Sequence, residues 1–318
     1  MSLKIIGAGK SVPEKRVSNK DLVGLIDTSD EWIFSRTGIR SRYVCTEETL
    51  TDLSASAALQ AIQKASLDPN GIDLIICSTI MGDYRTPSLA CCVSERIGAG
   101  CPAFDINAAC SGFIYALEIA SGYFSGGKTG NILIICAEMM SAHMDWNDRN
   151  TCVLFGDGAA ACVVTSGAAL RYIRLSATGN TSFISLATGT GNSPFVSRPR
   201  DSGFLKMQGQ EVFRFAVNTV ETEIRLALGS LDLSPGQIDW FILHQANKRI
   251  IDSARSKLNQ PAEKFPENID RYGNLSSVSV PLLLCEMLDA DKIMPGDVIF
   301  MTAFGSGLTA GSCVMVWE

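Results

Sequence analysis

One cysteine lies where the chain changes from a strand-like pattern to a helical one. Cys110 follows the apolar run 103–106, which is typical of the end of a buried strand, and precedes 113–120, where apolar residues recur at helical spacing. The backbone N–H groups and positive dipole end of a helix N-terminus favour a thiolate and can hold an oxyanion. Three small neighbours leave room for a substrate: Ala108, Ala109 and Gly112. The position therefore predicts a cysteine nucleophile.

Most of the other cysteines have a simpler interpretation. The chain contains 11 of them, and free cysteine commonly behaves as a small buried hydrophobe. We expect packing roles for six that lie in apolar strand-like runs or in a helical stretch: Cys77, Cys91, Cys92, Cys136, Cys162 and Cys313. Packing is also the alternative for Cys110, which differs from these six in its junction position and its small neighbours.

Composition excludes several classes of function. The chain has 318 residues, 46% hydrophobic and 19% charged, which favours a compact α/β protein with a large core. Its net charge of −6 argues against binding to nucleic acid. An odd cysteine count, no C-x-x-C pair and only two histidines argue against a disulfide framework and a zinc site. The N-terminus is typical of a first strand, and no apolar run approaches a membrane span, so we expect a cytoplasmic protein.

A weak internal repeat divides the chain. Asp73 and Asp239 each stand between a turn and an apolar strand, and Gly130 and Gly296 each precede another strand; both pairs are 166 positions apart. A shared offset favours duplication over chance. We therefore predict two related α/β halves, 1–168 and 169–318, each a mixed sheet with helices.

The repeat brings two polar residues towards the cysteine. Adding the offset to the number of Cys110 gives Ser276, which lies close to Asn274 and just before another helical run. His244 directly follows the apolar strand 240–243, at the strand end where α/β proteins usually place functional groups. Taken singly, His244 can be a core histidine and Asn274 a turn residue beside Gly273. Taken together with the cysteine, they predict one catalytic site, provided that the halves pack about a pseudo-twofold axis.

Six motifs in order along nearly the whole chain resemble the β-ketoacyl-acyl carrier protein synthase III family, the initiating condensing enzymes of type II fatty acid synthesis. They are Thr28-Ser29-Asp30-Glu31-Trp32-Ile33 with Arg36-Thr37-Gly38-Ile39-Arg40, Ala109-Cys110-Ser111-Gly112-Phe113, Phe155-Gly156-Asp157-Gly158-Ala159, His244-Gln245-Ala246-Asn247, Gly273-Asn274 and Ala303-Phe304-Gly305. The resemblance implies a thiolase-like layered fold of two pseudo-symmetric halves. It also implies a catalytic Cys110, His244 and Asn274.

The same resemblance assigns the substrate channel. Trp32, Arg36 and Arg149 are expected at the mouth of a coenzyme A channel, with the tryptophan and an arginine stacking on adenine. Asn247 and Gly209 are expected to line the pantetheine tunnel. The alternatives are a partly buried anchor for Trp32 and solvated surface positions for the arginines.

Three positions depart from the pattern of the family. Thr86, before Pro87, stands where some relatives carry an aromatic residue at the end of the acyl pocket, so we expect room for longer or branched primers. Ser306 replaces the middle of a Gly-Gly-Gly run and keeps a backbone N–H that, with that of Cys110, can bind an oxyanion. Lys248 adds charge beside the tunnel mouth. Phe304 is expected in the apolar lining of the acyl pocket.

A basic cluster follows the histidine motif on one expected helix: Lys248, Arg249, Arg255 and Lys257. An ordinary solvated helix face is the alternative. Its position beside the tunnel mouth favours a docking surface for an acidic carrier protein.

These features predict decarboxylative condensation of an acyl-CoA primer with malonyl-acyl carrier protein, without metal or redox cofactor, and the family pattern is a homodimer. The leading alternative is a related condensing or acyl-transfer enzyme of secondary metabolism with the same three residues. A thiolase would need a second cysteine where Ser306 stands, and a hydroxymethylglutaryl-CoA synthase would need an acidic base. A non-catalytic scaffold of the same fold is the alternative from another class of protein.

Overall fold

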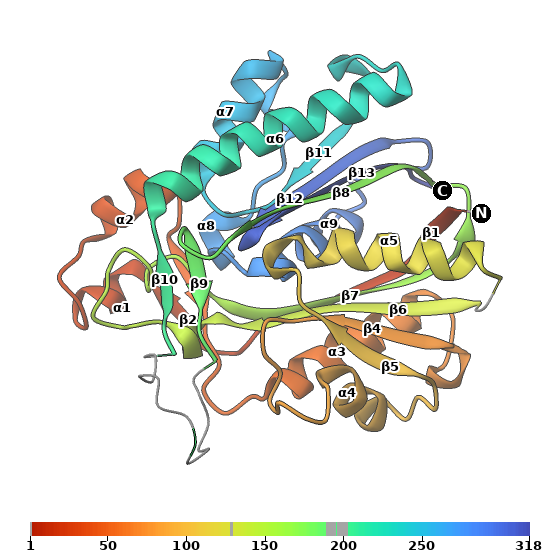
Figure 1. The fold of residues 1–318 in the computed structure, drawn as a ribbon, viewed down its shortest axis with the longest axis horizontal. Helices are drawn as coiled ribbons and strands as arrows, with labels where there is room; N and C mark the ends of the chain where they lie inside the picture. The colour runs from red at the N-terminus through yellow and green to blue at the C-terminus, as the bar shows by residue number, and fades with distance from the viewer. Residues whose placement is uncertain (1, 128–129, 189–194, 196–202) are drawn as a thin grey trace.

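Two mixed β-sheets form the centre of the protein. The computed structural model describes residues 2–127, 130–188, 195 and 203–318. The first sheet has the strand order β1-β7-β6-β4-β5 and the second β11-β12-β13-β8, with two small two-stranded sheets beside them (Figure 1). The strands are β1 (Ser2–Ser11), β2 (Arg16–Ser18), β3 (Ser41–Tyr43), β4 (Leu74–Ser78), β5 (Ala103–Ile106), β6 (Asn131–Met139), β7 (Asp157–Gly167), β8 (Leu170–Asn180), β9 (Ile184–Leu186), β10 (Leu205–Met207), β11 (Trp240–Leu243), β12 (Val298–Gly305) and β13 (Gly307–Val316).

Helices cover both faces of each large sheet. The α-helices are α1 (Asn19–Val23), α2 (Asp30–Thr37), α3 (Leu50–Lys64), α4 (Leu89–Ile97), α5 (Gly112–Ser125), α6 (Gly209–Leu231), α7 (Lys248–Leu258), α8 (Ile269–Tyr272) and α9 (Ser279–Asp289). Short 3₁₀ turns are η1 (Pro69–Gly71), η2 (Ala109–Ser111), η3 (Met140–His143), η4 (Pro235–Gln237), η5 (Ala262–Lys264) and η6 (Ser276–Val278). In the part of the chain described, every helix is too short or too polar to cross a bilayer.

The elements stack in five layers. The central hydrophobic cluster joins α5 and α9 to the inner faces of both sheets. A second cluster packs α3 and α4 on the outer face of the first sheet, and a third packs α6 and α7 on the outer face of the second (Figure 1). Helices buried on both sides must be apolar all round, which is why α5 and α9 carry almost continuous apolar runs. The result is the predicted pair of mixed sheets with helices.

Both sheets combine parallel and antiparallel pairing. In the first, β4 is parallel to β5 and β6, while β7 is antiparallel to β6 and β1. In the second, β11 is parallel to β12, and β13 is antiparallel to β12 and β8. The predicted strand before Cys110 is β5, but it is the edge strand and its four residues are only half-buried. That prediction was therefore right about the strand and wrong about its burial.

The two sheets repeat one plan. The Asp73 carboxylate accepts the N–H of Asn131 at 2.8 Å, and the Asp239 carboxylate accepts the N–H of Val298 at 2.8 Å. The turns η2 and η6 recur 167 positions apart, and each begins with a residue in the left-handed region, Ala109 at φ 48° and Ser276 at φ 52°. By this offset the counterpart of Cys110 is Ser277, so the sequence-based pairing with Ser276 was wrong by one residue.

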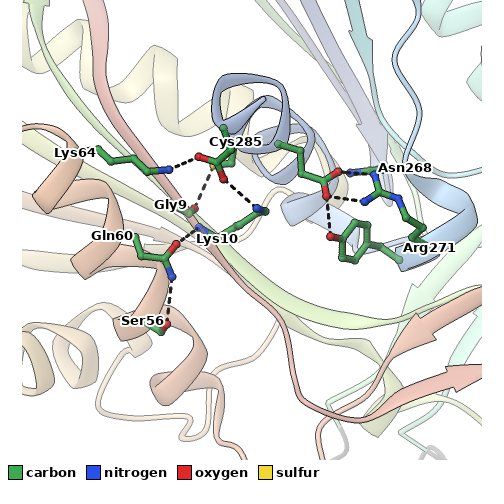
Figure 2. Close-up of polar contacts among 11 residues, drawn as sticks. Gly9, Lys10, Ser56, Gln60, Lys64, Asn268, Arg271 and Cys285 are labelled. Carbon is green, nitrogen blue, oxygen red and sulfur yellow. Dashed lines mark hydrogen bonds and ion pairs between the residues drawn. The ribbon is translucent and has the colours of Figure 1, made fainter. Parts of the chain in front are cut away.

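Polar contacts on α9 fasten the halves together. Lys10 of β1 donates to the Asp289 carboxylate at 3.0 Å, and Lys64 of α3 pairs with the same group (Figure 2). Inside the core, the Cys285 thiol donates to the carbonyl of Gly9 at 3.2 Å. Helix α9 therefore belongs to the second half by sequence and is held by elements of both.

Candidate active site

A cavity of about 100 Å³ lies where the two halves meet. Its wall includes the three predicted catalytic residues, which come from η2, the end of β11 and the loop before η6. Among the residues that the structure describes, none that lines it is an aspartate, glutamate, lysine or arginine. The lining residues are Cys110, Leu154, Phe155, Ile184, Met207, Gly209, Val212, Phe213, Phe215, His244, Ala246, Asn247, Ile250, Asn274, Phe304, Gly305 and Leu308.

Close backbone packing fixes the position of Cys110. It is the middle residue of η2, directly before α5. A Cβ atom on Gly112 would lie 1.8 Å from the Ser78 hydroxyl, and one on Gly305 would lie 2.7 Å from the Cys110 nitrogen. Gly112, one of the small residues that the sequence placed around the thiol, and Gly305 are thus required by packing. They bring the start of α5 against β4 and β12.

The environment of the thiol differs from the expectation. Burial raises the pKa of Cys110 to about 12, against a smaller lowering by the Ser276 hydroxyl, and the Glu138 charge raises it further. Desolvation disfavours the charged form, and it is the largest of the effects on this thiol. The prediction that this position favours a thiolate is therefore wrong for the unliganded protein, because the enclosing wall comes from segments distant in sequence.

His244 is a neutral imidazole at the end of β11. Its backbone N–H donates to Thr302 on β12 at 2.9 Å, which continues the parallel pairing into the site. The side chain is 1% exposed, and Nδ1 bonds to none of the residues that the structure describes. Burial lowers the pKa of His244 to about 3. The Phe304 ring packs edge-on against the imidazole with centroids 5.2 Å apart.

Asn274 is held by its backbone and by its own carboxamide. Its N–H donates to Leu154 at 2.9 Å, and its carbonyl accepts from Gly156 at 3.1 Å. Its Oδ1 accepts the N–H of Ser276 at 2.8 Å. Because that bond uses the oxygen, the Nδ2 donors of Asn274 are the groups available to a ligand in the cavity.

The helix before Asn274 is anchored on α9. Glu286 accepts two hydrogen bonds from Arg271, at 2.9 and 2.8 Å, one from Asn268 at 3.0 Å and one from the Tyr272 hydroxyl at 2.7 Å. Figure 2 shows Asn268 and Arg271 reaching α9 from this side. The bidentate arginine contact fixes orientation as well as distance, so the turn at Gly273–Asn274 starts from a rigid base.

The residues predicted for the oxyanion site and the acyl pocket do not all lie at the cavity. Ser306 follows Gly305 at the end of β12, and its hydroxyl donates to the Ile184 carbonyl at 2.8 Å. Phe304 is 3% exposed and lines the cavity. Thr86 is exposed and is not part of the cavity wall, because its loop faces solvent within the single chain. The expectation that Thr86 closes the acyl pocket is therefore not met by this chain alone.

The predicted coenzyme A residues gather at a wider opening beside the cavity. Trp32, Arg36, Gly209 and Asn247 all line it. The guanidinium carbons of Arg36 and Arg149 lie 4.7 and 4.9 Å from the centroid of the Trp32 ring. Arg149 is also tied to the Asp27 carbonyl at 2.8 Å. The tryptophan ring is thus in contact with two cations beside the opening.

Asn247 caps α7 rather than facing a ligand freely. Its Oδ1 accepts the N–H of Arg249 at 2.9 Å, and its Nδ2 donates to the carbonyl of Arg36 at 3.0 Å. Gly209 is the first residue of α6. Both residues line the cavity and the opening, so they mark the passage from one to the other.

The predicted basic cluster is only partly available. Lys248 pairs with Glu267 at 2.8 Å and with Asp252 at 3.4 Å, Arg255 pairs with Asp252, and Lys257 pairs with Glu221. No carboxylate pairs with Arg249 among the residues that the structure describes. Its guanidinium carbon lies 5.1 Å from the Phe213 ring, at the opening.

Several lining residues have no signal in the sequence. Ile184 lies in the short strand β9 and Met207 in β10, and neither strand has enough residues for a periodic pattern. Phe213 and Arg214 lie on α6, whose amphipathic pattern indicates a helix but not a lining role. Among the described residues no three metal-ligating side chains cluster.

The chain matches the family model of 3-oxoacyl-[acyl-carrier-protein] synthase III over residues 104–180 and that of its C-terminal part over 228–317. A β-ketoacyl-[acyl-carrier-protein] synthase III of Aquifex aeolicus is 43% identical over 99% of both chains.

Solved structures agree with the sequence matches. The 3-oxoacyl-[acyl-carrier-protein] synthase III crystal structure from Aquifex aeolicus has a TM-score of 0.93 at 42% identity, covering 99% of this chain and 100% of that one. The priming β-ketosynthase of the R1128 polyketide pathway has a TM-score of 0.91 at 33% identity, covering 100% of this chain and 96% of that one.

The fold is therefore the predicted thiolase-like fold, and the protein is a condensing acyltransferase. The chain belongs to the 3-oxoacyl-[acyl-carrier-protein] synthase III family, also called β-ketoacyl-[acyl-carrier-protein] synthase III.

Proposed function

We propose that the protein condenses an acyl-CoA primer with malonyl-acyl carrier protein, releasing CO2 and coenzyme A, and so initiates fatty acid synthesis. The observation that carries this proposal is one uncharged cavity lined by Cys110, His244 and Asn274, with a cationic opening beside it. A thiol, a neutral imidazole and a carboxamide are the groups that acyl transfer and enolate formation require.

The first half-reaction acylates Cys110. The sulfur attacks the thioester carbonyl, and its proton passes through the neutral His244 to the departing coenzyme A sulfur. The backbone N–H groups of Cys110 and Ser306 stabilise the oxyanion that forms in the transition state. Burial holds the thiol protonated, so its proton must leave as the sulfur attacks. The His244 imidazole lies in the same wall, and because burial lowers its pKa to about 3 it relays the proton in the transition state without holding it.

The second half-reaction forms the carbon–carbon bond. The malonyl thioester oxygen accepts hydrogen bonds from His244 and Asn274, loss of CO2 gives an enolate, and the enolate attacks acyl-Cys110. The tetrahedral intermediate expels the Cys110 sulfur, which regains a proton. The low pKa keeps His244 neutral, and a neutral imidazole still carries one N–H that can donate to the enolate oxygen.

The opening serves both substrates in turn. The Trp32 ring, held by Arg36 and Arg149, suits the adenine of coenzyme A, and Gly209 and Asn247 lie where pantetheine would pass. For the acidic carrier protein, Arg249 is the main member of the docking cluster, since Lys248, Arg255 and Lys257 already face carboxylates.

We further propose a cytoplasmic homodimer that uses no metal or redox cofactor. The free edge of the first sheet supports the dimer, because β5 is half-buried and carries Phe104 and Ile106. All 11 cysteines are free thiols, as expected in a reducing compartment. Light scattering tests the dimer, and activity in excess chelator tests the absence of a metal.

A second candidate is a priming condensing enzyme of secondary metabolism. The observation that favours it is the likeness to the R1128 priming ketosynthase at 33% identity. The same three residues would then serve, but with a different second substrate.

The direct test is intact mass spectrometry in two additions. Incubation with acetyl-CoA, or with longer or branched acyl-CoA, is expected to add one acyl group at Cys110. Malonyl-acyl carrier protein should then remove that group and produce the 3-oxoacyl-carrier protein. A stable adduct that malonyl-carrier protein cannot discharge would favour the second candidate. Failure of every acyl-CoA to label the protein would leave the scaffold interpretation.

A further inference from the structure

One buried carboxyl group near the thiol has no part in this mechanism. Glu138, near the end of β6, is 2% exposed. Its charge acts on the Cys110 thiol, so the two groups are close. Among the residues that the structure describes, no lysine or arginine forms an ion pair with it. Burying a carboxyl without a cation is unfavourable, which suggests that its oxygens are needed as acceptors.

Three donors converge on this carboxyl from outside its own strand. The N–H of Ile80, just after β4, donates to Oε2 at 3.0 Å. The hydroxyls of Ser276 and Ser277 donate to Oε1 at 3.1 and 2.8 Å. Both serines open η6, the turn that follows Asn274. Glu138 therefore fastens the end of the first sheet to the turn beside the predicted amide donor.

The turn needs such an anchor. Ser276 has φ 52°, in the left-handed region that residues other than glycine rarely adopt, and this conformation persists only where its surroundings enforce it. In it, the Ser276 N–H points at Oδ1 of Asn274, 2.8 Å away. The hydroxyl of the same residue is the group that Glu138 holds. One residue thus joins the carboxyl to the carboxamide.

We propose that Glu138 is a positioning residue that, through Ser276 and Ser277, fixes the carboxamide of Asn274 with its N–H donors facing the cavity. The inference rests on the proposed function, in which Asn274 acts on the malonyl thioester. Acylation uses backbone N–H groups of other segments, and removing the Glu138 charge would lower the pKa of the Cys110 thiol rather than raise it. Loss of Glu138 should therefore slow discharge of acyl-Cys110 by malonyl-carrier protein much more than it slows acylation.

The test separates the two half-reactions in Glu138→Gln. Acylation is followed by intact mass after mixing with acetyl-CoA. Discharge is followed after the acyl-enzyme is desalted and mixed with malonyl-carrier protein. Misplacing a reacting group by about 1 Å can cost about 100-fold, so we expect discharge to slow by about 10- to 100-fold while acylation changes by less than about 3-fold.

A double-mutant cycle asks whether the effect passes through Asn274. In an Asn274→Ala background, Glu138→Gln should not slow discharge further, because the group it positions is gone. Effects that multiply, or equal losses in both half-reactions, would overturn the proposal.

Glu223→Gln is the matched control. Glu223 is also 2% exposed and accepts the Ser312 hydroxyl at 2.6 Å, but it lies on α6, and its other partners are Arg174 and Ser176 rather than the serines of η6. Its replacement should change thermal stability without changing the ratio of discharge to acylation. The same ratio change in both variants would count against a specific role.

A milder variant protects the test against misfolding. Ser277→Ala removes one donor to Glu138 and leaves the Ser276–Asn274 bond intact. We expect a smaller slowing of discharge than in Glu138→Gln. If discharge is unchanged in both single variants while they are folded, the proposal is contradicted. If the wild-type acyl-enzyme is not discharged at all, the proposed function fails rather than this inference.

Discussion

Gly305 lies so close to Cys110 that a methyl group at residue 305 would stand 2.7 Å from the Cys110 nitrogen and 3.1 Å from its Cβ. The backbone of β12 therefore fits directly against the turn that carries the nucleophile. Two halves of the chain, nearly 200 residues apart, are held in register at this contact.

We expect Gly305→Ala to displace Cys110 and slow acylation by about 100-fold, while lowering the free energy of unfolding by about 1–3 kcal/mol. Gly122→Ala in α5 is the control, since a methyl group there meets nothing within 4 Å and should stabilise the helix by about 0.5–1 kcal/mol. Adduct formation and urea unfolding measure the two effects. Normal acylation in Gly305→Ala would show that the contact can relax.

The raised pKa of Cys110 predicts a pH dependence for alkylation. Because the thiolate is the reacting form, the iodoacetamide rate at Cys110 should rise by about tenfold per pH unit from pH 7 to 10 without a plateau. His244, with its pKa lowered to about 3, should add no inflection in this range. Site-resolved mass spectrometry measures the rate, and a plateau below pH 9 would show that the thiol is more acidic than its burial indicates.

Trp32→Ala should weaken the binding of acyl-CoA and leave the binding of smaller substrates unchanged. Loss of a stacking platform flanked by Arg36 and Arg149 is expected to raise the KM for acyl-CoA by about 3- to 30-fold, with kcat little changed. An acyl-pantetheine, which lacks the nucleotide, is the control substrate. Equal losses with both substrates would place the effect elsewhere than at adenine.

Charge reversal at Arg249 tests the docking cluster. We expect Arg249→Glu to raise the KM for malonyl-carrier protein by about tenfold and to leave acyl-CoA priming unchanged, with the difference shrinking at high salt. Lys292→Glu, an exposed position outside the opening, is the control. If priming falls as much as condensation, Arg249 serves the shared opening rather than the carrier protein.

Glu138 should make stability depend on pH. Burial raises its pKa from 4.5 to about 7, so the native state favours the protonated form. The wild type is then most stable relative to Glu138→Gln below pH 4.5, and that advantage is lost as pH rises through 7. The full difference is about 3 kcal/mol. Other groups that feel this charge, the thiols of Cys77, Cys110 and Cys136, have raised pKa values and do not titrate there. Urea unfolding between pH 5 and 8.5 measures the difference, and parallel curves would contradict it.

Local patterns were enough to predict the elements of the site. The junction of β5 with α5 and the position of His244 after β11 follow from short apolar runs and the residues that end them. Burial of Cys77 and Cys136 also follows from their strands and is confirmed, whereas Cys91 in α4 is exposed, against expectation. A helix pattern indicates an apolar face but does not fix which residue stands at its border.

Properties that depend on distant segments could not be predicted. Burial raises the pKa of Cys110, and the wall that buries it includes residues as far along the chain as Leu308. A lone glutamate ending the apolar run of β6 was visible in the sequence. Its burial was not, because its partners Ser276 and Ser277 lie 138 and 139 positions away.

Among the described residues, the cavity wall lacks aspartate, glutamate, lysine and arginine, and this favours the decarboxylation step of the proposed condensation. A malonyl carboxylate that enters gives up its hydration and finds no counter-ion in the wall, whereas CO2 is uncharged and leaves without that penalty. The reverse step, trapping CO2 on an enolate, would have to create a carboxylate in the same dry space. The wall therefore favours loss of CO2 from the bound malonyl group, and it leaves the overall equilibrium between substrates and products unchanged.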